Sequence, residues 1–88
     1  MKNNNKQPTL RVSLPLEHGE AQQAQDLLSL YADNSDRKRL LTSATYLMYK
    51  SHQALEQNLE REASILADLG KLAIDLFEDV SINNKNNY

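Results

Sequence analysis

The sequence predicts a mainly α-helical protein that forms a homodimer through one β-strand from each chain. Residues 9–14, TLRVSL, alternate between polar and apolar, and the apolar residues after them recur at spacings of three and four. No second stretch of strand-like quality follows. A single strand leaves its own backbone groups unpaired. We therefore expect two copies of residues 9–14 to pair as an antiparallel, two-stranded ribbon.

The alternation assigns the strand two faces. The apolar members are Leu10, Val12 and Leu14, and the polar members are Thr9, Arg11 and Ser13. Pro15 ends the strand, because proline has no N–H to donate to a neighbouring strand. The apolar face is expected to lie on the helices of both subunits, and the polar face is expected to point outward.

Helical periodicity covers most of the remaining chain. It predicts helices near residues 17–32, 35–52, 54–68 and 71–79. Gly19 weakens the first turn, so the first helix is expected to begin closer to Glu20. Ala32-Asp33-Asn34 is the predicted turn, with Asn34 suited to left-handed geometry, and Ser35 is the predicted N-cap. Gly70 is a possible break or C-cap.

The bulk composition limits the possible class of protein. An 88-residue chain without cysteine suits one small domain, for which oligomerisation is an expected source of stability. The absence of cysteine fits the cytoplasm, and no apolar run reaches the length of a membrane span. The expected organisation is a flexible basic arm (1–8), a domain of one strand and two helices (9–52), a helical dimerisation and partner-binding segment (53–80) and a disordered tail (81–88).

The two halves of the chain carry opposite charge. Residues 1–52 hold seven Lys or Arg and five acidic residues, a net of +2. Residues 53–88 hold three basic and seven acidic residues, a net of −4. This asymmetry suggests a different partner for each half, although chance scatter on a solvated surface gives the same pattern.

The outward strand face and the basic residues suit double-stranded DNA. A two-stranded ribbon fits the major groove, where arginine bonds guanine bidentately. Ser35 is followed by three basic residues at a helix N-terminus, where backbone N–H groups favour a phosphate. The phosphate contacts expected from these residues are Lys2, Lys6, Arg37, Lys38 and Arg39. Residues 9–52 are therefore the expected DNA-binding domain.

This order of elements resembles the ribbon-helix-helix family of DNA-binding dimers, the MetJ/Arc/CopG class. TLRVSL is similar to its ribbon strand, EAQQAQDLLSLY to its first helix and SDRKRLLTSATYLMYK to its second. The family's turn between these helices usually contains glycine, and Ala32-Asp33-Asn34 does not. The resemblance implies that Thr9, Arg11 and Ser13 contact bases and that Ser35, Asp36 and Arg37 hold a phosphate.

The C-terminal part resembles that of plasmid partition adaptors of the ParR/StbB type. ILADLGKLAIDLFEDV, Ile65 to Val80, is similar in placement and in its acidic and apolar composition. The resemblance implies a sequence-specific DNA-binding homodimer that acts in plasmid partition and recruits a motor protein, an actin-like ATPase filament. Leu72, Leu76 and Phe77 are the predicted partner-binding residues, although an extension of the dimer core explains the same apolar stripe.

Two alternatives remain open. Within the DNA-binding class, the chain fits a transcriptional repressor or a relaxosome accessory protein of conjugation. In a different class, it fits a helical protein-interaction adaptor without a DNA role. That adaptor would be a monomer or a dimer built on helices, with residues 9–14 packed within their own chain or disordered. No catalytic or metal-binding pattern is present, because His18 and His52 are far apart and cysteine is absent. We therefore expect neither an enzyme nor a cofactor.

Overall fold

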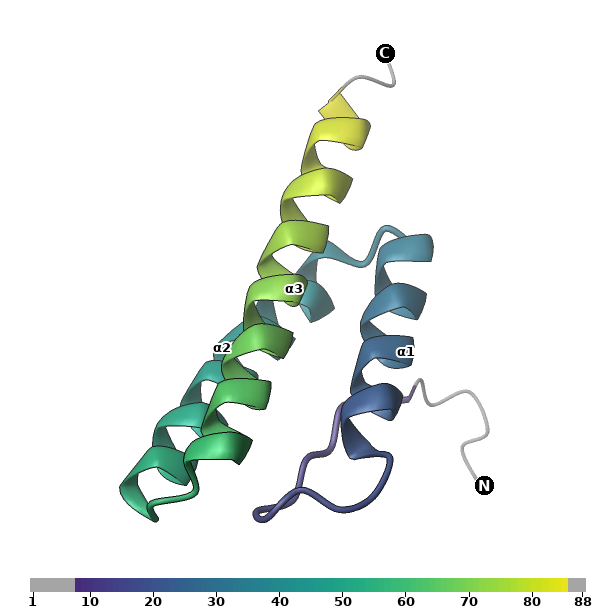
Figure 1. Ribbon diagram of the computed structural model, residues 1–88. Helices are drawn as coiled ribbons and strands as arrows, with labels where there is room; N and C mark the ends of the chain where they lie inside the picture. The colour runs from purple at the N-terminus through teal and green to yellow at the C-terminus, as the bar shows by residue number, and fades with distance from the viewer. Residues whose placement is uncertain (1–7, 86–88) are drawn as a thin grey trace, which may run out of the picture.

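Three α-helices form the fold in a computed structural model that describes residues 8–85 (Figure 1). The helices are α1 (Glu20–Asp33), α2 (Arg37–Glu56) and α3 (Glu60–Lys85). Figure 1 shows α2 and α3 as a hairpin, with α1 beside α3. All three pairs of helices are in contact, and α2 and α3 share the largest interface. No helix in residues 8–85 combines the length and the apolar character that a membrane crossing requires.

The predicted ribbon-helix-helix fold is wrong. Within residues 8–85 the protein has three helices and no β-strand, so the expected ribbon is absent. Residues 9–14 instead lie on the helices of their own chain, where Val12 is buried with 6% of its surface exposed. The physical reason is that helices of the same chain already cover the apolar side of this segment. The alternating pattern indicates that the side chains on one side of the segment are buried. Packing on helices can bury them as well as packing in a sheet can.

A single hydrophobic core joins all three helices. Its largest fully buried side chains are Leu28, Leu40, Leu47 and Leu66. They come from α1, α2 and α3, so each helix contributes to the same interior. Fully burying a leucine contributes about 1.5–3 kcal/mol, which makes these four positions the centre of the fold.

A glycine and a half-buried carboxylate cap determine where the first two helices begin. Gly19 adopts a left-handed φ of 86°, and α1 begins at Glu20, as the sequence predicted. The predicted left-handed residue, Asn34, has a φ of −93°, and Ser35 takes that geometry instead, with a φ of 54°. The N-cap of α2 is consequently Asp36 and not Ser35, and its Oδ1 accepts a hydrogen bond from the N–H of Arg39 at 3.1 Å.

Gly70 does not interrupt the last helix, so the predicted break or C-cap there is wrong. The two helices expected at 54–68 and 71–79 are one helix, α3, which continues to Lys85, into the predicted tail. Gly70 is buried at the contact with α2, where an added Cβ would lie 2.8 Å from the Sδ of Met48. The glycine therefore serves the close approach of two helices. The actual boundary lies earlier, at Asn58, which has a positive φ of 63° between α2 and α3.

Candidate nucleic-acid interface

The polar row at the N-terminal segment, residues 8–14, faces solvent. Thr9, Arg11 and Ser13 are exposed, whereas Val12 is buried between them. Arg11 makes no hydrogen bond or ion pair with another residue of the described range 8–85. Its guanidinium group is therefore available to a ligand, which is the property that DNA contact requires.

Side chains of the helices hold the N-terminal segment in place. The hydroxyl of Tyr31 donates to the carbonyl of Pro8 at 2.9 Å, and that of Tyr46 donates to the carbonyl of Val12 at 3.4 Å. Farther along, the N–H of Ser13 donates to Oε2 of Glu20 at 2.8 Å. Three helical residues, two from α1 and one from α2, thus fix the position of the exposed row.

The ionisation of Glu20 and Tyr31 matches these contacts. Burial raises the pKa of Glu20, but hydrogen bonds from the backbone N–H groups of Glu17 and Ser13 outweigh it, so the pKa lies below its ordinary value. Burial raises the pKa of Tyr31, and the positive charge of Arg39 partly offsets this increase. Glu20 is consequently a carboxylate, and Tyr31 keeps the proton that it donates to Pro8.

The basic side chains in the first turn of α2 do not share one surface. The guanidinium of Arg39 lies over the ring of Tyr31, 5.8 Å from its centroid, and also 3.9 Å from the carboxylate of Asp36. Arg37 turns instead toward α3, where its Nε donates to the Oγ of Ser81 at 2.8 Å. Lys38 is exposed. Asp36 already occupies the N–H of Arg39, a donor that a phosphate at this helix end would use.

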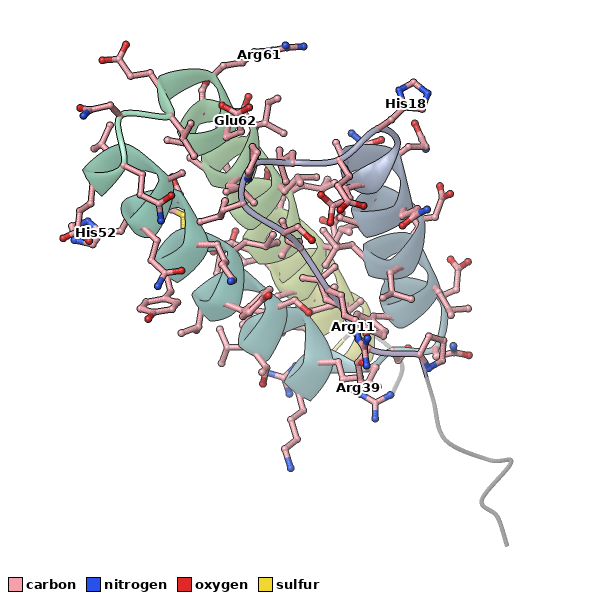
Figure 2. All side chains as sticks on the ribbon, turned by 90° about the horizontal axis from the view of Figure 1, so that it is seen from below. Arg11, His18, Arg39, His52, Arg61 and Glu62 are labelled. Atoms are coloured by element: carbon pink, nitrogen blue, oxygen red, sulfur yellow. The ribbon has the colours of Figure 1, made fainter. Side chains whose placement is uncertain are left out.

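Arg39 lies beside the N-terminal segment. Thr9 and Arg39 line one shallow pocket of about 210 Å³, together with Tyr31, Thr42 and Tyr46. Figure 2 shows Arg11 and Arg39 at the same end of the molecule. Pockets for small organic ligands hold about 300–1,000 Å³, so this pocket is too small for one. The arrangement suits contact with an extended polyanion at the surface.

Acidic residues lie at both ends of the molecule. Figure 2 shows Arg61, Glu62 and His18 away from Arg11 and Arg39. Residues 56–62 include three glutamates and one arginine, a net of −2. Glu78 and Asp79 lie on α3 between Phe77 and Ser81, which contact Arg37 at the start of α2. The opposite charges of the two halves of the sequence are therefore not separated in the fold.

The other predicted site residues have different surroundings. Lys2 and Lys6 lie outside the described residues. Leu72, Leu76 and Phe77 are each half-buried against the core, and the guanidinium of Arg37 lies 5.1 Å from the centroid of the Phe77 ring. The predicted partner-binding side chains thus already have contacts within the chain.

The two histidines have separate surroundings. His52 lies on α2 and its Nε2 is 3.2 Å from the carboxylate of Glu56, one turn away. His18 lines an open depression with Glu17, Arg61 and Glu62. Among residues 8–85 no group of three or more His, Cys, Asp or Glu side chains could hold a metal ion.

Sequence reasoning missed the residues that hold the N-terminal segment. No such role was predicted for Tyr31, Tyr46 or Glu20. Their spacing along the chain gives no signal, because the contacts join residues 7 to 34 positions apart.

Comparison of the chain with protein-family models, curated proteins and solved structures gave no match.

Proposed function

We propose that this protein binds double-stranded DNA through the basic face, which we define as Thr9, Arg11, Ser13, Lys38 and Arg39. The observation that carries the proposal is the exposed guanidinium of Arg11, without a partner in residues 8–85, beside a pocket that Thr9 shares with Arg39. Arginine and lysine supply most of the affinity of proteins for DNA through its phosphates.

The members of the basic face supply complementary donors. Arg11 can bond a phosphate or the O6 and N7 atoms of guanine bidentately. Lys38 offers a mobile ammonium group to a phosphate. The hydroxyl of Thr9 can bond either a phosphate or a base edge. The hydroxyl of Ser13 lies in the same row but already hydrogen-bonds the carboxylate of Glu20. These roles keep the predicted residues of the polar row without requiring a paired strand.

The acidic residues at the end of α2 are distant from the basic face. Lys38 and Glu56 lie eighteen residues apart on α2, which is roughly 27 Å along a helix. Salt screens charges beyond about 8 Å at physiological ionic strength. DNA at the basic face is therefore largely shielded from Glu56. Glu78 and Asp79 lie closer, on the part of α3 that Arg37 contacts.

The biological setting is a separate question from DNA binding. Plasmid partition, recruitment of an actin-like ATPase, repression and a relaxosome role all follow from a resemblance whose ribbon is absent from residues 8–85. No contact in the structure favours one of these roles over another. DNA binding is the element that they share, and it is the function proposed.

Salt-dependent binding of a fluorescent duplex to the full chain tests the proposal. Arg11→Ala should weaken binding to random-sequence DNA and lower the salt slope by about 1 if Arg11 contacts a phosphate. If Arg11 reads a base, the loss of about 1–3 kcal/mol should appear only on a preferred site. Arg61→Ala is the matched control, because it removes an exposed arginine that lies away from Arg11 and Arg39.

A helical adaptor without a DNA role is the second candidate. It is favoured by one observation, the packing of residues 9–14 against the helices of their own chain, as that hypothesis predicts. The same experiment separates the two candidates. Absence of binding at low salt would exclude the basic face and leave the adaptor. Equal effects of Arg11→Ala and Arg61→Ala on both random-sequence DNA and a preferred site would do the same.

A further inference from the structure

Tyr31 contacts both parts of the chain that supply the basic face. Its hydroxyl donates to the carbonyl of Pro8, at the start of the N-terminal segment. The guanidinium of Arg39, in the first turn of α2, lies over its ring. One side chain of α1 thus joins the N-terminal segment to the start of α2.

The buried position of Tyr31 keeps it from contacting DNA itself. Only 3% of its surface is exposed, and its hydroxyl proton is already donated to Pro8. Thr9 and Arg39, which line the same pocket, are the more accessible residues there. An effect of Tyr31 on DNA binding must therefore act through the residues that it holds.

The N-terminal segment depends on side chains of the helices for its position. In the described part of the chain, no hydrogen bond between two backbone groups involves this segment. Two of its carbonyls accept from tyrosine hydroxyls, that of Pro8 from Tyr31 and that of Val12 from Tyr46. These two anchored carbonyls lie on either side of Arg11 in the sequence. They therefore restrict where the backbone of Arg11 can move.

We propose that Tyr31 is a positioning residue for DNA binding, which holds Arg11 at a fixed place relative to Arg39 so that both arginines meet one stretch of the duplex. This inference rests on the proposed function. Figure 2 shows the two arginines at the same end of the molecule. A segment that is already ordered before binding does not lose that conformational freedom on binding, so the affinity is higher.

The neighbouring charges make Arg11 the arginine through which Tyr31 acts. The carboxylate of Asp36 lies 3.9 Å from the guanidinium of Arg39 and offsets part of its charge. Arg11 has no ion pair within residues 8–85, and the depression that it lines beside α1 has no acidic side chain. Removal of the Tyr31 hydroxyl keeps the ring under Arg39 and releases only the segment that carries Arg11. The effect of Tyr31→Phe should consequently depend on Arg11.

A double-mutant cycle on the full chain tests this dependence. The dissociation constant of a fluorescent duplex is measured for the wild type, Tyr31→Phe, Arg11→Ala and the double variant. Tyr31→Phe should weaken binding about two- to tenfold, the range that corresponds to one hydrogen bond. The double variant should bind as Arg11→Ala does, because no guanidinium remains to be positioned. A residue that only stabilised the fold would weaken binding by the same factor in both backgrounds.

Two further variants complete the experiment. Tyr46→Phe frees the carbonyl on the other side of Arg11 and should show the same dependence on Arg11. Tyr49→Phe is the matched control, because its hydroxyl lies on the exposed surface and contacts Gln53, and it should bind as the wild type does. Circular dichroism at the temperature of the binding assay confirms that each variant is folded.

The outcomes separate this inference from the proposed function. If Arg11→Ala weakens binding but Tyr31→Phe does not, the positioning role is overturned and the proposed function stands. Equal effects of Tyr31→Phe with and without Arg11 would also overturn the positioning role. A wild type that does not bind at low salt would overturn the proposed function and this inference together.

Discussion

The Nε of Arg37 donates a hydrogen bond to the Oγ of Ser81 across 2.8 Å, joining the first turn of α2 to the last part of α3. The Ser81 hydroxyl in turn donates to the carbonyl of Phe77 at 2.9 Å. The Arg37 guanidinium lies over the Phe77 ring. A residue that the sequence assigned to phosphate thus contacts one that it assigned to a protein partner, and both stabilise the chain itself.

Arg37→Ala should lower the free energy of unfolding by about 1 kcal/mol, since an exposed cation–π contact and a hydrogen bond are both lost. For a chain of this size, the melting temperature should fall by about 4–8 °C. Thermal denaturation followed by circular dichroism measures the change. Lys38→Ala, at the exposed neighbouring position, is the control and should stay within about 0.5 kcal/mol of the wild type. Equal stability of the two variants would contradict the role of Arg37.

Gly70→Ala should have an effect that depends on Met48. Alanine is favoured over glycine inside a helix by about 1 kcal/mol, but its Cβ would lie 2.8 Å from the Sδ of Met48. In a Met48→Ala background this contact is absent, so Gly70→Ala should stabilise the protein by about 1 kcal/mol. In the wild type the gain should be smaller. Urea denaturation of the four proteins measures the coupling, and identical effects in both backgrounds would show that the two residues are not in contact.

Glu20→Gln should change how stability depends on pH. The pKa of Glu20 is lowered in the folded protein, so its carboxylate stabilises the fold above the ordinary pKa of about 4.3. That contribution is lost as the pH falls through the lowered value. The wild type should therefore be more stable than Glu20→Gln at pH 6, with the difference disappearing in acid. Melting temperatures from pH 6 to pH 2 measure it, with Glu78→Gln, an exposed glutamate on α3, as the control for one lost charge.

Tyr31→Phe and Tyr46→Phe should loosen the N-terminal segment. Each removes one hydroxyl donor, for which about 0.5–1.5 kcal/mol is expected. Tyr31 is the more buried and its hydrogen bond is shorter, 2.9 Å against 3.4 Å, so its variant should lose more. Hydrogen exchange of residues 9–14 and urea denaturation measure both effects. Tyr49→Phe, with a hydroxyl on the exposed surface, should change neither, and the reverse order would contradict the assignment.

Elements with strong periodicity could be predicted closely. The first helix was expected to begin near Glu20 and does so, because Gly19 takes a left-handed φ that opposes a helical turn. Gly70 was misjudged for the opposite reason. Its small size permits a close contact with Met48, twenty-two residues away, and no local pattern reveals such a contact.

The candidate site was predictable only in part. The exposed row of Thr9, Arg11 and Ser13 follows from alternation alone, since one side of the segment had to be apolar. The separation of Arg37 from Arg39 did not follow, although the two are only two residues apart. Arg37 meets Ser81 on α3, and Arg39 meets Tyr31 on α1, so the surroundings of each depend on how the helices pack.

The sequence by itself determined that this chain is mainly helical, that residues 9–14 bury one side, and that basic and acidic residues gather in different halves. These properties depend on local periodicity and composition, which act over a few residues. Only the tertiary structure decided that the apolar side of residues 9–14 packs on helices of the same chain and that α3 continues through Gly70. Alternation requires cover for the apolar side chains, and either a second strand or a helix can provide it. Which one does so depends on the packing of distant residues.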